Sequence, residues 1–177
     1  MSLAQTVQEY LEWEEVPYDV ISHPCTYSSL ATARISRIPA KKLAKCVVLG
    51  DGYGYLMAIV PADRNVDIAH ISQTLQRDFA LASEAEIADL FYDCLPGSVP
   101  PVCEAYGFDS IIDQQIWNAR DVYFEGGDHE ALIHLDGKTF RQLMASAELG
   151  DIKLPPDYRH SVSPVSHSLQ SLCRSTD

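Results

Sequence analysis

The sequence predicts an α+β fold in a single domain, with a mixed β-sheet that carries helices on its faces. A chain of 177 residues with 46% hydrophobic residues is long enough to bury a core and short enough for one domain. The predicted strands and helices do not alternate regularly, as they do in a doubly wound fold. Two pairs of predicted strands are each joined by a short turn, which indicates β-hairpins.

The elements of the first half follow from hydrophobic periodicity and from capping residues. Apolar residues recur at helical spacing near the N-terminus, which predicts an amphipathic helix. Ser28 and Ser29 can cap a second helix, and Pro39 ends it because proline does not fit a helix interior. The predicted elements are a helix over residues 4–15, a strand over 18–22, a helix over 28–36, and a hairpin of strands 46–49 and 55–60 around Asp51-Gly52.

The second half contains two further capping signals and a proline-rich loop. Asp67 can cap a helix, and Ser83 with Glu86 has the S-x-x-E spacing of a capping box. The prolines and the glycine of residues 96–101 exclude a helix interior or a central strand. The predicted elements are helices over 67–79 and 83–91, a strand over 110–113, a hairpin of strands 121–125 and 131–135 around Gly127-Asp128, and a helix over 139–147 with Gly150 just past its end.

The hydrophobic pattern decays near residue 151. Prolines, serines and scattered polar residues dominate residues 154–177. We therefore predict one domain over residues 1–150 and a C-terminal tail over residues 151–177. The tail is expected to lie on the surface or to be disordered, because its composition is too polar to form a core.

Signals for membranes and secretion are absent from the sequence. No apolar run reaches the ~18 residues that a transmembrane helix needs, and residues 1–15 lack the basic and apolar regions of a secretory signal. The five cysteines are odd in number and contain no C-x-x-C pair, which fits reduced thiols better than a disulfide framework. The sequence therefore predicts a cytoplasmic protein without a membrane partner.

Charge is distributed unevenly along the chain. The formal net charge of −12 argues against non-specific binding to nucleic acid, because a negative surface repels phosphate. Five of the thirteen lysines and arginines nevertheless fall within residues 34–45, where no acidic residue occurs: Arg34, Arg37, Lys41, Lys42 and Lys45. This basic cluster either contacts a few phosphates at one place or is an ordinary solvated surface.

Several familiar catalytic motifs are not matched. The glycines at 52 and 54 lack the following Lys-Ser/Thr of a phosphate loop, and no G-x-S-x-G sequence is present. His129-Glu130 with His134 resembles the zinc motif H-E-x-x-H. The second histidine is one residue too far, however, and falls in a predicted strand, where residues five apart face opposite sides. We therefore expect no metal and no cofactor.

Two features remain as candidates for chemistry. Lys45 stands where the basic cluster enters a predicted buried strand, so its ammonium is held rigidly and can bind a phosphate or a carbonyl. The loop over residues 97–101 combines a glycine, which lets a ligand approach the backbone closely, with prolines that stiffen it. The alternatives are a solvated lysine at the end of a strand and a structural turn.

Several short segments, taken together in their order along the chain, form a specific sequence pattern. In chain order the set is His23, then residues 45–49 (KCVVL), 58–61 (AIVP), 97–101 (GSVPP), 111–113 (IID), 122–127 (VYFEGG) and 133–135 (IHL). This set resembles the YbaK/prolyl-tRNA synthetase-associated domain family, whose members are aminoacyl-tRNA deacylases that act in trans. The resemblance extends from about residue 5 to about residue 148. It implies a single-domain α+β fold with a mostly antiparallel, bent β-sheet and helices packed around it.

The resemblance also implies which residues form the site. Lys45 matches a family lysine that is needed for deacylation, and Gly97, Ser98, Val99 and Pro101 match the loop that lines the amino-acid pocket. The lysine is often followed by threonine or asparagine in the family, whereas here Cys46 follows it. Pro100 at the variable position of the loop, and Cys103 where a glycine often stands, are further departures. Such positions shape the pocket, so the amino acid that is removed stays open.

The implied reaction needs little acid–base machinery. An aminoacyl ester is already activated, so hydrolysis depends mainly on positioning and on polarisation of the carbonyl group. The hypothesis assigns catalysis to Lys45, Gly97 and Ser98. The pocket is assigned to His23, Cys46, Val99, Pro101, Glu125 and His129. Contacts to the tRNA are assigned to Arg34, Arg37, Lys41 and Lys42.

Some of these assignments have structural alternatives. His23 can equally be a hydrogen-bonded structural histidine, and Glu125 and His129 can belong to a solvent-facing turn. The implied partner is a tRNA acceptor end that carries a mischarged small amino acid, and no DNA partner is expected. Whether a synthetase also takes part is left open. The alternative function is a non-catalytic module that binds a tRNA end or a synthetase.

Overall fold

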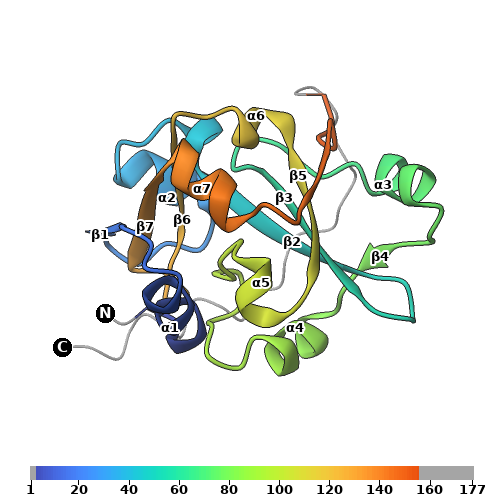
Figure 1. The fold of residues 1–177 in the computed structure, drawn as a ribbon, viewed down its shortest axis with the longest axis horizontal. Coiled ribbons are helices and arrows are strands. Elements are labelled where there is room, and N and C mark those ends of the chain that lie inside the picture. Colours follow the sequence, from blue (N-terminus) through green and yellow to red (C-terminus); the bar gives the residue numbers. More distant parts are fainter. Residues whose placement is uncertain (1–2, 156–177) are drawn as a thin grey trace.

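A computed structural model of the protein describes residues 3–155, and it has the predicted α+β architecture (Figure 1). The elements are α1 (Gln5–Trp13), β1 (Asp19–Ser22), α2 (Ser29–Ile35), the 3₁₀ turn η1 (Ala40–Lys42), β2 (Ala44–Gly50), β3 (Tyr55–Pro61), α3 (Ile68–Leu75), β4 (Ala80–Leu81), α4 (Glu84–Leu90), α5 (Cys103–Tyr106), β5 (Asp109–Asp113), α6 (Gln114–Trp117), β6 (Asp121–Glu125), β7 (Ala131–Asp136), α7 (Gly137–Leu143) and β8 (Glu148–Gly150).

Local signals in the sequence account for most of these boundaries. Ser28 accepts a hydrogen bond from the third residue after it and caps α2, and Asp67 caps α3 in the same way. Ser83 and Glu86 form the complete capping box at the start of α4. Both predicted hairpins are present, as β2–β3 and β6–β7. The helix α3 is shorter than predicted, because Gln76 has a left-handed backbone (φ 53°) that ends it before Phe79.

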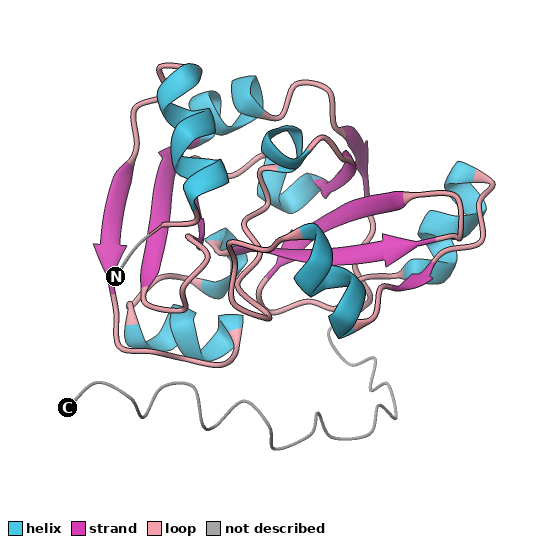
Figure 2. Ribbon diagram, turned by 90° about the horizontal axis from the view of Figure 1, so that it is seen from below, coloured by secondary structure: helices cyan, strands magenta, loops and turns pink. Residues whose placement is uncertain are grey.

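The strands form two sheets rather than one bent sheet. The smaller sheet has the order β1-β7-β6 and is antiparallel throughout. The larger sheet has the order β4-β2-β3-β5-β8, in which β3, β5 and β8 run parallel to one another. Most pairings are antiparallel, as predicted. In the view of Figure 2 the smaller sheet stands apart from the larger one, and helices pack around both.

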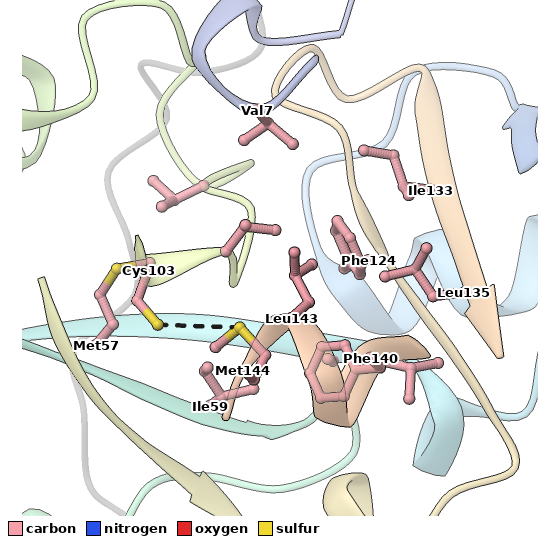
Figure 3. Close-up of a cluster of buried hydrophobic side chains, with 14 of the residues drawn as sticks. Val7, Met57, Ile59, Cys103, Phe124, Ile133, Leu135, Phe140, Leu143 and Met144 are labelled. Atoms are coloured by element: carbon pink, nitrogen blue, oxygen red, sulfur yellow. Dashed lines mark hydrogen bonds between the residues drawn. The ribbon is translucent and has the colours of Figure 1, made fainter. Parts of the chain in front are cut away.

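The main hydrophobic core lies between the two sheets. Met57 and Ile59 of β3 face it from the larger sheet, and Phe124 and Ile133 face it from the smaller one. Figure 3 shows these side chains in one cluster with Met144, which directly follows α7. A second core on the other face of the larger sheet contains side chains from β2, β3 and α3.

A third, smaller cluster positions the ends of several elements. It joins Ala33 of α2, Leu132 of β7 and the residues beside the ends of the β2–β3 hairpin, Leu43 and Ala62. A parallel β-bridge between Leu43 and Tyr123 links the hairpin to the smaller sheet. This cluster holds α2 over the outer face of the smaller sheet and beside the start of β2.

The C-terminal part of the domain differs from the prediction. The helix expected over residues 139–147 ends at Leu143, and Gly150 ends the strand β8 instead of following a helix. Residues 151–154, which the sequence analysis assigned to the tail, pack on the domain: Ile152 and Leu154 are buried, and Lys153 forms a β-bridge with Val66. The packed chain therefore continues to Leu154. The rest of the predicted tail, residues 156–177, lies outside the described residues.

The described cysteines are in two states. Cys46, Cys94 and Cys103 are free thiols, as the sequence suggested. Cys25 is disulfide-bonded, so the expectation of reduced thiols does not hold for this residue. Among residues 3–155, no helix is both long enough and apolar enough to span a bilayer.

Candidate functional site

A cavity of about 310 Å³ opens where α2, the start of β2, the end of β6 and the loop over residues 96–101 meet. Three of the four segments come from parts of the chain that the sequence analysis singled out. The cavity is lined by Tyr27, Ser28, Ser29, Leu30, Ala44, Lys45, Cys46, Ala62, Gly97, Val99 and Glu125. It therefore brings together Lys45, the glycine loop and Glu125, which are far apart in sequence.

Lys45 is the cation of this cavity. It is the second residue of β2, pairs with Val60 of β3, and is partly buried. Burial lowers the pKa of the ammonium group, and the charge of Asp63 opposes that effect. No side chain or carbonyl among the described residues forms a hydrogen bond or ion pair with this ammonium. Lys45 therefore presents a positioned positive charge that an anionic ligand can neutralise.

The loop over residues 96–101 is fixed by hydrogen bonds that leave Gly97 open. The backbone N–H and the hydroxyl of Ser98 both donate to the Leu95 carbonyl, at 3.1 and 2.8 Å. Ser98 is fully buried and does not line the cavity, so it shapes the turn. Gly97 has φ +88°, a conformation that favours glycine. Its N–H has no acceptor among the described residues and is available to a ligand.

His129 packs against this loop and is hydrogen-bonded to it. Its Nε2 lies 2.8 Å from the Pro96 carbonyl, so Nε2 carries the hydrogen and donates to it. The ring lies close enough to Gly97 that a Cβ there would stand 3.6 Å from it. The Leu95 N–H also donates to the Gly127 carbonyl, at 2.8 Å. The β6–β7 turn thus anchors the loop, and His129 is one layer behind the cavity wall.

Glu125 is a buried carboxylate in the cavity wall. Its Oε1 accepts a hydrogen bond from the Thr32 hydroxyl at 2.7 Å, and Thr32 is also 2.5 Å from the Thr26 hydroxyl. Its Oε2 lies 3.6 Å from Nε2 of His23. Burial raises the pKa of Glu125, while the Thr32 hydrogen bond and the two nearby histidines, His23 and His129, oppose the rise.

The alternation of side chains along strands explains how these groups meet. Glu125 and Leu132 are direct partners in the β6–β7 pair, and Ile21 and Leu132 are partners in the β1–β7 pair. Partners across a pair share one face of the sheet. His23 continues the pairing beyond β1 through its N–H to the Glu130 carbonyl, so it falls on that same face. The face is covered by α2, which supplies Thr32.

The remaining predicted residues divide into those at the cavity and those away from it. Cys46 and Val99 line the cavity, whereas Pro101 is buried and does not line it. Burial raises the pKa of the Cys46 thiol, which makes it a wall residue rather than a nucleophile. Arg34, Arg37 and Lys41 are exposed. Lys42 is bound to Asp121 at 2.7 Å, so its charge is already paired.

Sequence reasoning missed much of the wall that α2 contributes. Ser28 and Ser29 were identified only as helix caps, and Tyr27 and Leu30 were not singled out. Thr32, which holds Glu125, is fully buried inside a short helix. A polar residue on the buried face of a helix is a signal for an internal hydrogen bond, but its partner, 93 positions away, is not visible in the local pattern.

The model of the aminoacyl-tRNA editing domain family matches residues 23–143, which is more than half of the chain. The chain belongs to the aminoacyl-tRNA editing domain family. The match begins at His23, and it includes Lys45, the loop with Gly97, and Glu125. Every segment that lines the cavity of this editing domain therefore lies within the matched residues. None of the curated proteins matches the sequence significantly.

Solved structures share the fold of this editing domain. A crystal structure of a candidate trans-editing enzyme for prolyl-tRNA synthetase is 21% identical, with a TM-score of 0.74 over 86% of this chain and 97% of that one. A hypothetical protein is 18% identical, with a TM-score of 0.75 over 85% of this chain and all of that one. A candidate signal transduction protein from Marinobacter aquaeolei VT8 is 22% identical, with a TM-score of 0.69 over 87% of this chain and 31% of that one.

Proposed function

We propose that the protein is a deacylase that hydrolyses the ester bond between a tRNA and a wrongly attached small amino acid. The observation that carries the proposal is the cavity itself. In a member of the aminoacyl-tRNA editing domain family, the cavity combines the Lys45 ammonium with the backbone N–H of Gly97, and neither group has a partner among the described residues. These are the two kinds of group that such a reaction requires.

The reaction depends on positioning rather than on a strong nucleophile. Lys45 binds the terminal phosphate or the ribose region of the tRNA, and this fixes the ester in the cavity. The Gly97 N–H donates to the ester carbonyl, or orients the attacking water, as negative charge develops on oxygen. Ser98 contributes indirectly, because its two hydrogen bonds to Leu95 hold Gly97 in the required conformation.

The size of the cavity favours a small amino acid. Its volume of about 310 Å³ is at the low end of the range for ligand sites. The terminal ribose must share this space with the amino acid. Small side chains form much of the wall: Ala44, Cys46, Ala62 and Val99. We propose that this wall sieves the amino acid by size, where one methylene group is worth about 1–3 kcal/mol of discrimination.

The exposed members of the basic cluster are proposed to hold the acceptor end of the tRNA. Arg34, Arg37 and Lys41 are exposed on or beside α2, which also supplies part of the cavity wall. Their charge lies close in sequence to Lys45, within an otherwise acidic chain. A local positive patch of this kind attracts phosphates at one place while the rest of the surface repels them.

Deacylation of a panel of tRNAs tests the proposal. The tRNAs are charged with alanine, serine, threonine, cysteine or proline and are incubated with wild type, Lys45→Ala and the control Lys138→Ala. We expect wild type and the control to hydrolyse one or two of them, and Lys45→Ala to be slower by at least about 100-fold with an unchanged circular dichroism spectrum. Full activity in Lys45→Ala would contradict the role that is proposed for Lys45. Binding of tRNA without hydrolysis of any member would favour a non-catalytic module that binds the tRNA end.

A further inference from the structure

Two buried hydrogen-bonding atoms face each other at the wall of the cavity without a partner. They are Oε2 of Glu125 and Nε2 of His23, separated by 3.6 Å. Both residues are 7% exposed, and no hydrogen bond from residues 3–155 reaches either atom. An unpartnered buried polar atom costs about 1–3 kcal/mol. Two of them side by side, next to a cavity, need an explanation.

Counting protons shows that this pair holds one. The Nδ1 atom of His23 lies 3.0 Å from the Pro24 carbonyl, which only accepts, so Nδ1 carries a hydrogen. In a neutral imidazole the other nitrogen, Nε2, is then a bare acceptor. It would face a carboxylate oxygen, which is also an acceptor, and the two would repel each other. A proton on either Nε2 or Oε2 removes this repulsion, so His23 and Glu125 share one proton as a unit.

The surroundings keep the shared proton near the cavity. The Thr32 hydroxyl has one hydrogen and two acceptors within reach, Oε1 of Glu125 at 2.7 Å and the Ser28 carbonyl at 3.2 Å. The shorter contact assigns this hydrogen to Oε1, so Thr26 donates to Thr32, and the chain of hydroxyls occupies Oε1. The other charged or titratable groups that act on Glu125 are His129, which favours the carboxylate, and Asp128, which disfavours it. Lys45 stands in the wall of the same cavity. Burial dominates, and it raises the pKa of Glu125.

Only Glu125 can exchange the proton with a ligand. Its side chain is 9% exposed and lines the cavity, whereas the side chain of His23 is 1% exposed. His23 therefore reaches the cavity through Glu125 alone. In this arrangement Glu125 exchanges the proton with a ligand, and His23 holds the proton between exchanges.

We propose that Glu125 is the acid–base residue of the proposed deacylation and that His23 is its positioning partner, which holds the shared proton. Glu125 accepts a proton from water as the water oxygen bonds to the ester carbonyl carbon. The bond from that carbon to the ribose oxygen then breaks, and Glu125 returns the proton to the ribose oxygen. Water and ester yield a free amino acid and a tRNA with its hydroxyl restored, and the pair ends as it began. This inference rests on the proposed function.

The variant Glu125→Gln separates chemistry from structure. Glutamine keeps an oxygen for the Thr32 hydroxyl, and its amide can donate to Nε2 of His23, but it cannot exchange a proton. We expect kcat to fall by about 100-fold or more, as for loss of a general acid–base group, with little change in KM. The wild-type rate is expected to decline at acidic pH, where the pair gains a second proton, and Glu125→Gln to lack this decline. Glu14→Gln, at an exposed glutamate outside the cavity, is the control.

Magnetic resonance tests the shared proton without any activity. At neutral pH, the ring ¹⁵N signals of His23 show which nitrogens carry a hydrogen, and the side-chain ¹³C signal of Glu125 shows whether its carboxyl group is protonated. We expect one proton on the pair, either on Nε2 of His23 or on the Glu125 carboxyl group, and we expect the signals of the exposed His70 to be the same in wild type and Glu125→Gln. A bare Nε2 beside an ionised Glu125 would overturn the inference.

The kinetic outcomes distinguish the inference from the proposed function. If wild type hydrolyses a tRNA ester and Glu125→Gln keeps its kcat within about threefold, acid–base chemistry at Glu125 is excluded and deacylation stands. If Glu125→Gln raises KM at constant kcat, Glu125 binds the substrate amine instead, and the inference is again overturned. If wild type hydrolyses none of the esters, the proposed function fails, and the catalytic role of Glu125 fails with it.

Discussion

Asp113 and Glu125 are buried carboxylates at the ends of two strands, β5 and β6, yet their surroundings differ. Asp113 is fully buried, and both of its oxygens are used. Its Oδ1 accepts the Gln115 N–H at 2.9 Å, and its Oδ2 accepts the Ile152 N–H at 3.3 Å and the Lys153 ammonium at 3.0 Å. These bonds cap α6 and attach residues 152 and 153 to the larger sheet.

Glu125 accepts one hydrogen bond, whereas Asp113 accepts three. Thr32 donates to one oxygen of Glu125. The other oxygen faces Nε2 of His23 and has no hydrogen bond within the described part of the chain. The cavity borders Glu125 and does not border Asp113. A carboxylate with a purely structural role is expected to have both oxygens hydrogen-bonded, because each buried oxygen without a hydrogen bond lowers the stability of the fold. The difference therefore separates a carboxylate with a structural role, Asp113, from Glu125, whose unsatisfied oxygen fits the acid–base role proposed for it.

The largest effect that we predict is on the structural side of this comparison. Replacing Asp113 with alanine removes the cap of α6 and the acceptor of the Ile152 N–H, and it leaves the Lys153 ammonium with Asp151 as its remaining partner. We expect the free energy of unfolding to fall by about 2–4 kcal/mol, because buried N–H groups lose their acceptor and a partly buried ion pair is broken. Urea unfolding measures it, and the activity per folded molecule should stay at the wild-type level.

A matched variant controls for charge alone at the same site. Asp113→Asn keeps an acceptor for the N–H donors, so its loss should be smaller than that of alanine. A loss below about 1 kcal/mol in Asp113→Ala would contradict the assignment of Asp113 as a structural anchor, since removal of ordinary surface groups has effects of that size.

The sequence could predict those parts of the fold that depend on local signals. The capping box of Ser83 and Glu86 is a local signal and was found, as were the two hairpins, whose turns lie between adjacent strands. The strand β8 pairs in parallel with β5, and its partner at Ile111 lies far away in sequence. Local patterns carry no record of such pairing, so this strand was not predicted. Gly150 was interpreted as the residue just past the end of a helix, and the continuation through Ile152 as a tail.

The site was predictable to a similar degree. Lys45 and Gly97 were identified from the basic cluster that enters a strand and from the glycine- and proline-containing loop, and the resemblance to the editing family assigned them roles. Both residues line one cavity. Ser98 was expected to act directly, but the structure directs both of its donors to Leu95, a contact that spacing alone does not reveal. The contact of Glu125 with Thr32 depends on how α2 lies over the smaller sheet. Such packing is decided by side chains from many elements at once.

The second effect is smaller and has the opposite sign. Glu125→Gln is expected to be as stable as wild type at neutral pH, or more stable by about 1 kcal/mol. Its amide can donate to Nε2 of His23, a buried atom that lacks a hydrogen bond in the wild type. Burial raises the pKa of Glu125 in the folded protein above its unfolded value. Its stabilising contribution is therefore complete below the unfolded pKa and is lost as pH rises through the folded pKa.

The pH dependence of this variant provides the check. Glutamine does not titrate, so the advantage of Glu125→Gln should grow from acid to neutral pH and vanish where Glu125 is protonated in both states. Chemical unfolding at pH 4 and at pH 7.5 measures the two limits. A variant that loses stability at pH 7.5 would show that the carboxylate is held for structure, as Asp113 is.

The smallest effect concerns two adjacent lysines that differ as the two carboxylates do. Lys42 is bound to Asp121 at 2.7 Å, and this ion pair lowers the pKa of Asp121. Lys41 is exposed, and no hydrogen bond or ion pair with another described residue involves it. A paired lysine must leave its carboxylate before it can bind a phosphate, whereas an unpaired one needs only to release water and counterions.

Lys41→Ala should therefore weaken tRNA binding more than Lys42→Ala does. We expect a loss of several-fold for Lys41→Ala, with the slope of log affinity against log salt reduced by about 0.7 for the lost phosphate contact. For Lys42→Ala, affinity and slope should stay near wild type, because the tRNA gains little from a charge that Asp121 already neutralises. Filter binding over a series of salt concentrations measures both quantities. Equal losses in the two variants would mean that the Lys42–Asp121 pair opens on binding, and that partners seen in the free protein do not predict which charges the tRNA uses.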